Sequence, residues 1–380
     1  MTSDLRSDAE TLAWLTLLRA PGIGSSSLRA LILRAGSAES VLQQRERWRE
    51  EFRFGEDTLA WLRKPDPQRL AADQEWLARE GRQLLTFDAD DYPALLREIG
   101  AAPPGLFVVG DAALLWLPQV AIVGARSATA GGLANARSFA QHLGAAGFAI
   151  TSGLADGVDG AAHAAALDGG YATIAVMGTG PDRIYPRKHR ALAARIAESG
   201  VLVSEFPPGV EARPDHFPRR NRLIAGLSLG VLVVEASIQS GSLITARLAG
   251  DQGREVFALP GSIHNPLARG CHQLIRQGAR LVETSDEIVA ELAPLAQALG
   301  ERLRERLQPV AAATTVAAAG VAQRDPEYAA VLAALGHDPV SLDELAVRSG
   351  LGVATLSSML LVLELDGEVS SVGGGRYQRI

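Results

Sequence analysis

The chain has 380 residues, enough for two or three domains with a substantial buried core. Its composition, 47% hydrophobic and 21% charged residues, is that of a globular protein, and no apolar run reaches the roughly 18 residues of a membrane span. The single cysteine, Cys271, excludes an internal disulfide and a thiolate metal cage. Together with a polar start unlike a signal peptide, it predicts a cytoplasmic protein without a membrane partner.

The net charge of −6 argues against a general nucleic-acid coat protein, but this charge is unevenly distributed. Residues 120–280 contain 16 Lys and Arg against 11 Asp and Glu, whereas the rest of the chain contains 21 against 32. A basic centre between acidic ends can bind an anion locally.

Residues 1–65 are predicted to form a small helical domain. The turn Pro21-Gly22-Ile23-Gly24 between two apolar helical stretches resembles a helix–hairpin–helix, whose backbone N–H groups face DNA phosphate. Any tight helix–helix turn uses glycine, and the flanks hold few basic residues. A small helical interaction domain, SAM-like or helix–hairpin–helix-like, is therefore favoured over DNA contact.

Residues 66–293 are predicted to form an extended Rossmann-like α/β domain. A helix at 92–99 and a strand at 105–109 precede apolar runs that alternate with helical patterns. The runs are QVAIV, FAIT, ATIAVM, VLVSE, GVLVVEA, EVFALP and ARLVE. Buried runs separated by helices indicate a doubly wound, mostly parallel sheet, with its ligand site outside the C-terminal ends of the strands.

The C-terminal part reads as an Ala-rich linker, 294–325, followed by a winged-helix module, 326–380. Ser341 and Glu344 form a capping box at the start of a helix. The expected second helix, about 353–365, contains no Arg or Lys. A major-groove reader normally needs basic residues there, so a protein-interaction role is favoured over sequence-specific DNA reading.

Two strand-to-helix loops are candidate phosphate sites. Gly124, Arg126 and Ser127 follow the first run, with a helix starting near Thr129. Glycine permits a tight turn, a helix N-terminus offers free N–H groups, and Arg126 adds charge. A plain turn with a surface arginine is an equal alternative for this loop alone. The second loop contains Gly153.

Asp159 and His163 lie four residues apart on one helix face and suggest general acid–base chemistry. A helix-capping aspartate and a packed core histidine are favoured instead, because no nucleophile or metal-ligand set accompanies them. Further along, Arg187 and Lys188 follow Tyr185-Pro186 at the next helix start, where an anion offsets their conflict with the helix dipole. We favour phosphate binding there over a solvated charge run.

The segment FPRRNRLI places Arg219, Arg220 and Arg222 around Asn221, just before the apolar run at 230–236. Guanidiniums this close repel one another, and a phosphate backbone neutralises them through paired hydrogen bonds. We expect this cluster to be a third basic loop at the same sheet edge.

A helix start after GVLVVEA carries hydroxyl groups and glycine, a pattern typical of an anion-binding nest. Its residues are Ser240, Gly241, Ser242 and Thr245. There is no Walker A sequence, so an NTPase is not predicted, and no spacing of His264, Cys271 and His272 indicates a metal site.

In order along the chain, these motifs resemble the DNA-processing protein A family (DprA, also called Smf). The motifs are VGAR at 123–126, SGLADGVDGAAHAAAL at 152–167, MGTG and IYPRKHR at 177–190, SEFPPG at 204–209, FPRRNRLIAGLS at 217–228, VVEASIQSGSLITARLA at 233–249 and LPGSIHNPLARGCHQLIRQGA at 259–279. One departure is Ala125, where many members have serine, so one phosphate contact is in doubt.

The resemblance implies a non-enzymatic cytoplasmic protein without cofactor or metal. It would bind single-stranded DNA, protect it, and load RecA onto it during natural transformation. It also implies a homodimer formed through the Rossmann-like domain, for which an amphipathic pattern suggests a face near Leu274 and Ile275. Phosphates would be contacted at the three basic segments, and Tyr185, Phe206 and Phe217 are candidates either for base stacking or for the core.

Two other functions remain as alternatives. A nucleotide phosphoribohydrolase of the lysine-decarboxylase-like group has a related sheet, but its PGGxGTxxE loop corresponds here to ASIQSGSLITA, which lacks the glycine pair and the acid. A sequence-specific regulator would act through the winged helix, whose second helix lacks basic residues.

Overall fold

The computed structural model describes residues 7–307 and parts of the C-terminal module. The latter are 331–332, 334–335, 340–352, 355–356, 359–360, 363, 369–372 and 376–379. The chain divides into two compact units, Met1–Gln308 and Pro309–Ile380. The helical N-terminal part, expected as a separate domain at 1–65, lies in the same compact unit as the sheet.

The N-terminal part of the first unit is helical. Its helices are α1 (Asp8–Leu18), α2 (Ser25–Ala35), α3 (Ala38–Gln43), α4 (Arg45–Glu51), α5 (Glu56–Arg63) and α6 (Pro67–Leu77). Trp14, Leu31 and Trp48 are buried at their centre. The expected turn joins α1 to α2, and Gly22 has a φ of 77° there, which glycine adopts without strain.

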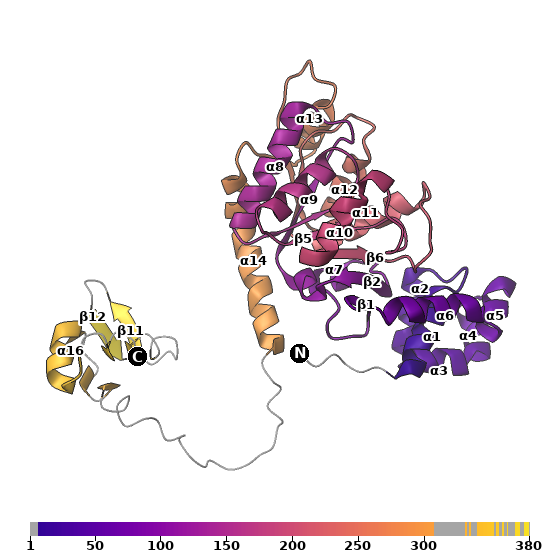
Figure 1. The fold of residues 1–380 in the computed structure, drawn as a ribbon, viewed down its shortest axis with the longest axis horizontal. Helices are drawn as coiled ribbons and strands as arrows, with labels where there is room; N and C mark the ends of the chain where they lie inside the picture. Colours follow the sequence, from indigo (N-terminus) through magenta and orange to yellow (C-terminus); the bar gives the residue numbers. More distant parts are fainter. Residues whose placement is uncertain are drawn as a thin grey trace, which may run out of the picture. The chain divides into compact units, whose positions relative to one another are not determined.

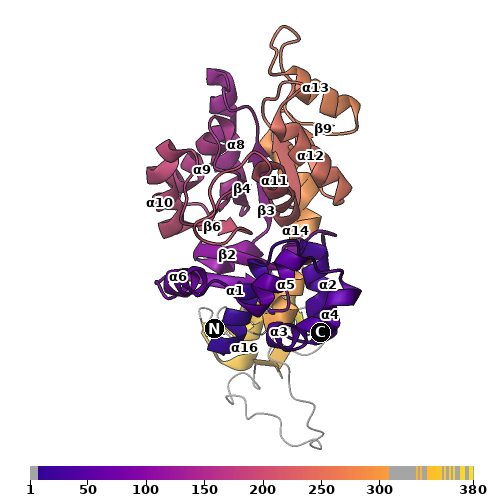
Figure 2. The same cartoon turned by 90° about the vertical axis from the view of Figure 1, so that its right-hand side faces the viewer.

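These helices pack on one edge of the sheet through α1 and α6. Leu15, Trp76 and Phe107 form a buried apolar cluster between the helices and strand β2 (Gly105–Gly110). Arg19 also binds buried Asp73 (Nη2–Oδ1, 2.6 Å) and donates to the carbonyl of Pro208 (2.8 Å). Figures 1 and 2 show the indigo helices gathered beside β2.

The sheet has nine strands, and its central part is parallel as expected. The strands other than β2 are β1 (Arg82–Thr86), β3 (Gln119–Val123), β4 (Ala149–Ser152), β5 (Thr173–Val176), β6 (Val201–Ser204), β7 (Gly230–Val233), β8 (Glu255–Ala258) and β9 (Arg280–Leu281). Their order is β1-β2-β6-β5-β4-β3-β7-β8-β9. β1 and β2 are antiparallel additions at one edge, and β1 is a strand that the sequence patterns did not predict.

Helices cover both faces, so the sheet is doubly wound. The helices are α7 (Ala94–Glu98), α8 (Ala130–Ala145), α9 (Val158–Asp168), α10 (Arg190–Ser199), α11 (His216–Leu227), α12 (Gly241–Asp251), α13 (Arg269–Arg276) and α14 (Ser285–Leu307), with 3₁₀ turns η1 (Ala112–Trp116) and η2 (Arg187–His189). Side chains of α7, α11, α12 and α13 share one core cluster, and those of α8, α9 and α14 share another. In Figure 2, α9 and α10 lie opposite α12 and α13.

Strand β3 marks the reversal of the winding direction. The chain passes from β3 through β4 and β5 to β6 on one side, and β7 then returns to pair with β3 on the other. In doubly wound sheets the crevice outside the strand ends at such a point is the usual ligand site. The loops after β3 and β7 therefore frame the expected site.

The linker expected at 294–325 is wrong for its first part. Helix α14 continues to Leu307, with Pro294 inside it. Residues 294–307 are rich in Ala, Leu, Glu and Arg, which are the strongest helix formers. The remainder of the expected linker, 308–325, lies outside the described residues.

The second unit contains strands β10 (Val340–Ser341), β11 (Val369–Val372) and β12 (Arg376–Arg379), in the order β10-β12-β11, and helix α16 (Leu342–Ser349). The Ser341 hydroxyl accepts from the N–H of Glu344 (3.3 Å), as the capping pattern predicts. Much of the second helix expected at 353–365 lies outside the described residues. Within the described parts of the chain, no helix is both long and apolar enough to span a bilayer.

Candidate nucleic-acid interface

The loop after β3 carries Arg126 to the surface. Gly124 is required at the turn, because a Cβ there would lie 2.7 Å from Val158. We had expected free N–H groups at the start of α8, but this helix start is already occupied. The carboxylate of Glu235 accepts from the N–H of Thr129 (2.9 Å) and from its hydroxyl (2.7 Å). An internal carboxylate thus occupies the position predicted for a phosphate, and Arg126 remains as the exposed charge of this loop.

The loop after β4 is organised by Asp159. We had expected its carboxylate to cap α9. Instead it accepts from the N–H groups of Gly153 (3.1 Å) and Ala155 (3.3 Å) in the loop before the helix. Burial raises the pKa of Asp159, and the charge of Arg220 opposes this effect.

His163 is a packed core residue, as favoured from the sequence. It is fully buried, and its Nδ1 lies 2.7 Å from the hydroxyl of Thr173. Burial lowers the pKa of His163 to about 3, so the ring is neutral at physiological pH. Its protonation state therefore does not change in the range that acid–base chemistry would use.

The arginine cluster lies on a helix and not, as predicted, on a loop. All of it belongs to the first turns of α11. Arg220 is only 5% exposed, and its Nη1 donates to the carbonyls of Val176 (2.8 Å) and Gly153. A Cβ on Gly153 would collide with this guanidinium, so glycine creates the space for it. Burial lowers the pKa of Arg220 to about 10, which leaves it charged at neutral pH.

Arg222 and Arg219 share the buried carboxylate of Glu205. Arg222 binds it through two parallel contacts of 2.8 and 2.7 Å and also donates to the carbonyl of Ala101 (3.0 Å). Arg219 lies 3.6 Å from the same carboxylate, with a side chain that is 53% exposed. The expected repulsion between three guanidiniums is therefore relieved inside the protein, and only Arg219 of the three is largely open to solvent.

The segment after β5 presents an aromatic ring and two cations. Tyr185 is 48% exposed, and its ring centroid lies 5.5 Å from that of Phe217. Arg187 is exposed on η2, whereas Lys188 lies 3.0 Å from the carboxylate of Asp156. Phe206, the third aromatic candidate, is buried and stacks on a histidine ring, which assigns it to the core.

The start of α12 forms a polar rim. Ser240 caps the helix by accepting from the N–H of Ser242 (3.3 Å), and their hydroxyls lie 2.7 Å apart. Asn221 reaches toward the carbonyl of Gly241 (3.5 Å). Thr245 is only 2% exposed and still borders the same hollow.

A pocket of about 260 Å³ brings most of the predicted residues together. It is lined by Gly124, Arg126, Arg220, Asn221, Ser240, Gly241, Ser242 and Thr245, with Phe217 and Asp159 among its other residues. A small extension of about 50 Å³ adds Gly153 and Tyr185 and shares Arg126 and Phe217 with it. We call the two together the Arg126 pocket. Ser127, Arg187, Lys188, Arg219 and Arg222 do not line it.

The charge and the aromatic surface of this pocket coincide. The guanidinium carbon of Arg126 lies 5.8 Å from the ring centroid of Phe217. Within the described parts of the chain, Arg126 has no carboxylate within ion-pair distance, and no set of three side chains is suited to a metal ion. A free cation beside two aromatic rings is suited to an anion that carries flat groups.

A model of the DNA recombination-mediator protein A family matches residues 83–293, more than half of the chain. The chain belongs to this family. Two further models match, one for the DprA-like N-terminal HHH domain at 8–44 and one for the DprA winged helix domain at 315–375. The resemblance inferred from the motifs and the three expected fold types are confirmed, and the last match begins within the expected linker.

Individual members of the family agree with this assignment. Protein Smf of Escherichia coli (strain K12) is 43% identical over 308 residues, which cover 80% of this chain and 79% of that protein. DNA processing protein A from Streptococcus pneumoniae has a similar structure, with a TM-score of 0.67 and 35% identity over 74% of this chain and 97% of that one. The structure of the Helicobacter pylori protein, described in terms of its single-stranded DNA binding mode, has a TM-score of 0.51 and 30% identity over 56% and 96%.

Three carboxylates of this family member have roles that our sequence analysis did not predict. Glu235, Glu205 and Asp156 each bind a helix start or a basic side chain next to the pocket. Glu235 directly follows a buried strand, a position that carries functional side chains in such sheets. Nothing in the local pattern distinguishes the other two, because their partners are distant in the sequence.

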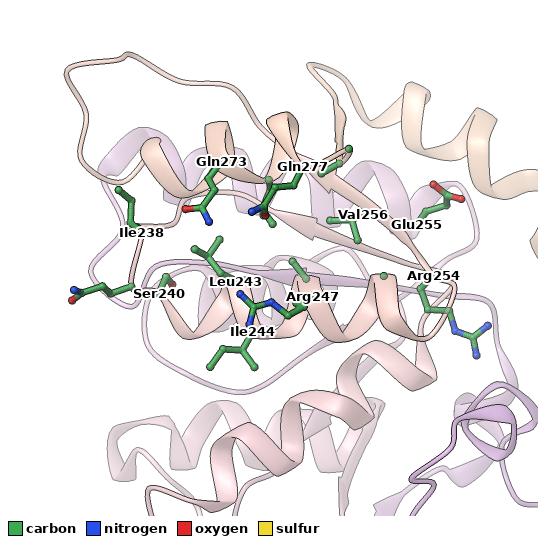
Figure 3. A pocket seen from close by; sticks show the side chains of 16 residues that line it. Ile238, Ser240, Leu243, Ile244, Arg247, Arg254, Glu255, Val256, Gln273 and Gln277 are labelled. Atoms are coloured by element: carbon green, nitrogen blue, oxygen red, sulfur yellow. The ribbon is translucent and has the colours of Figure 1, made fainter.

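A second pocket, of about 500 Å³, lies between α12 and α13 (Figure 3). Leu243 and Arg247 of α12 face Gln273 of α13 and Gln277, which directly follows that helix, across the pocket, and the exposed Ile238 lies at one end. Leu274 and Ile275, the residues expected near a dimer face, contribute to the core beneath this surface.

The burial of Arg220 generates a stability prediction. Arg220→Gln removes the guanidinium hydrogen bonds to Asn221 and to the carbonyls of Gly153 and Val176, and it leaves buried Asp159 without its cation. The free energy of unfolding should therefore fall by about 3–5 kcal/mol. Arg219→Gln, one residue away but exposed, should change it by at most about 0.5 kcal/mol. Urea denaturation followed by circular dichroism measures both. Equal effects of the two substitutions would contradict the assignment of Arg220 as a structural cation.

Proposed function

We propose that this chain binds single-stranded DNA along the sheet edge centred on the Arg126 pocket. The observation that carries the proposal is the exposed, unpaired guanidinium of Arg126 beside the ring of Phe217, at the point where the winding of the sheet reverses. A nucleic acid strand presents charged phosphates and flat bases. The pocket offers the guanidinium of Arg126 to the phosphates and the ring of Phe217 to the bases. The single-stranded DNA binding mode described for the Helicobacter pylori relative supports the same ligand.

The candidate residues divide into two groups by exposure. Exposed cations and polar groups at the rim would contact phosphates: Arg126, Ser127, Arg187, Lys188, Arg219, Ser240 and Gly241. Less exposed residues would hold the rim in shape: Gly124, Gly153, Arg220, Asn221, Arg222, Ser242 and Thr245. We therefore propose a supporting role for Arg220 and Arg222, for which the sequence analysis predicted DNA contact.

Single strands are favoured over duplexes by the aromatic surface. Phe217 and Tyr185 can stack only on bases whose faces are open, and stacking tolerates any base because each has a π-face. Charge contacts to phosphate are likewise independent of sequence. We therefore expect binding that tolerates sequence and depends steeply on salt.

We further propose that the protein works in the cytoplasm, protects incoming single strands, and loads RecA onto them during transformation or recombination. Membership of a recombination-mediator family supports this role. We propose no catalytic activity. The phosphoribohydrolase alternative needs a free acid near the sheet edge, whereas Glu235 is buried and bound to Thr129.

The DNA proposal predicts a specific loss for Arg126→Gln. Affinity for a labelled oligothymidine should fall at least about tenfold, because a hydrogen bond to a charged group contributes about 1.5–3 kcal/mol. The slope of log affinity against log salt should become shallower by about 0.7, the value for one phosphate contact on a single strand. Fluorescence anisotropy over a salt series measures both quantities.

Arg137→Gln is the matched control for this experiment. Arg137 is exposed on α8 and lines none of the pockets described, so its loss should leave both quantities nearly unchanged. Equal affinity of wild type and Arg126→Gln, or equal affinity for single strand and duplex, would contradict the proposal.

RecA loading has its own test. On DNA covered by a single-strand-binding protein, addition of wild-type protein should shorten the lag before RecA hydrolyses ATP, and Arg126→Gln should lose this effect. If the wild-type protein binds DNA tightly but leaves the lag unchanged, the loading role is wrong while DNA binding stands.

We propose that the homodimer forms through the surface between α12 and α13. Ile238 is 59% exposed at the end of that pocket, and Leu274 lies in its floor. An exposed aliphatic side chain beside a hollow is suited to burial against a second copy.

Ile238→Glu should convert dimers into monomers, because a carboxylate buried against an apolar partner surface has no compensating charge. Leu33→Glu is the matched control, since Leu33 is equally apolar and 70% exposed on α2. Size-exclusion chromatography with light scattering gives the mass of each variant. A dimer that survives Ile238→Glu and is lost with Leu33→Glu would place the interface on the N-terminal helices instead.

A further inference from the structure

A third pocket, of about 490 Å³, adjoins the Arg126 pocket at Tyr185, and the two pockets together form a groove. The third pocket is lined by Thr179, Asp182, Arg183, Ile184, Tyr185, Arg187, Arg190, Glu211 and Ala212. We call it the Arg190 pocket. Tyr185 also lines the small extension of the Arg126 pocket, so one exposed ring separates the two.

Three exposed arginines give the Arg190 pocket its charge. Within the described parts of the chain, Arg187 and Arg190 have no carboxylate at ion-pair distance. Arg183 lies 3.4 Å from Asp182, but the Asp182 carboxylate also accepts from the N–H of Gly209 (2.7 Å) and so serves the adjacent loop. Two carboxylates line the pocket and weaken its positive field: that of Asp182 beside Arg183, and that of the exposed Glu211.

The groove does not extend equally in every direction. A neighbouring pocket toward α6 shares Asp182 and Arg183 with the Arg190 pocket. Its basic residues are already paired: Arg19 with Asp73, Arg69 with Asp66, and Arg79 with Glu75. Unpaired positive charge therefore runs from Arg126 past Tyr185 to Arg190 and ends there.

We infer that a single DNA strand filling the Arg126 pocket continues over the ring of Tyr185 into the Arg190 pocket, where Arg183 and Arg190 bind its phosphates. Tyr185 stacks on a base at the crossing. This inference rests on the proposed function and extends it with a second subsite, which gives the protein a longer footprint than the Arg126 pocket alone. Neither Arg183 nor Arg190 was among the residues predicted to contact DNA, although Arg190 is the last residue of the motif IYPRKHR.

The test compares two lengths of DNA. Oligothymidines of about 5 and about 15 nucleotides span the range of site sizes typical of single-strand-binding modules. The double variant Arg183→Gln/Arg190→Gln should bind the short strand like wild type. On the long strand it should lose at least about tenfold in affinity, and the salt slope should become shallower by about 1.4, the value for two lost phosphate contacts.

Two further variants sharpen the result. Arg137→Gln/Arg195→Gln removes two exposed charges outside both pockets, with Arg195 on the same helix as Arg190, and should leave binding of both lengths unchanged. Glu211→Gln should tighten binding of the long strand only, because it removes an exposed carboxylate from the lining of the Arg190 pocket. Thermal unfolding of each variant should match wild type, since all of these side chains are exposed.

The outcomes separate this inference from the proposed function. If Arg126→Gln weakens both lengths but Arg183→Gln/Arg190→Gln weakens neither, the second subsite is wrong and DNA binding stands. An equal loss on short and long strands would also overturn the subsite, because the arginines would then belong to the first pocket. If wild type binds neither length, both the proposed function and the extension fail.

Discussion

The proposed nucleic-acid edge depends on one buried cation, the guanidinium of Arg220. It donates to the carbonyls of Gly153 and Val176, which follow β4 and end β5, and so ties two strand ends to α11. A charge this deeply buried is tolerated only where acceptors and an opposite charge replace water. Asp159 supplies the charge, and the missing side chain of Gly153 supplies the space. Phe217, carried by the same helix, thereby acquires a fixed place beside Arg126.

Internal carboxylates decide which positive charges remain available at this edge. Glu235 occupies the start of α8, and Glu205 binds Arg222, so neither group needs an external anion. Asp156 restrains Lys188 in the same way, although this contact is exposed and therefore weak. The charges left over are those of Arg126 and of the arginines beyond Tyr185. The exposed arginines therefore form a row of positive charges, because the carboxylates neutralise only the cations that lie deeper.

Much of the fold was predictable because it is encoded locally. Each of the seven apolar runs overlaps a strand, and all but β9 are largely buried, since a buried parallel strand needs only a short continuous apolar segment. Which of Arg219, Arg220 and Arg222 are buried was not predictable, because successive helical residues point about 100° apart. Their partners, Gly153 and Glu205, are also distant in sequence. Strand β1 was missed because it is only half-buried at the edge of the sheet, so it lacks a continuous apolar run. The end of α14 was missed because Pro294 suggested a break there, whereas the Leu-, Arg- and Glu-rich residues after it continue the helix.

The distinction between paired and unpaired arginines also explains how a chain with a net charge of −6 can attract a polyanion. At physiological ionic strength a charge is screened beyond about 8 Å, so carboxylates elsewhere on the surface scarcely affect a phosphate in the groove. Within that distance, Arg126 acts beside a neutral aromatic ring, while Arg220 behind it has a pKa of about 10 and stays charged. The carboxylate of Asp159 lines the same pocket and offsets this charge, so the buried cation acts on the pocket by stabilising the edge. Its loss would weaken DNA binding even without a direct contact, which makes exposure, and not residue type, the criterion for separating contacts from supports.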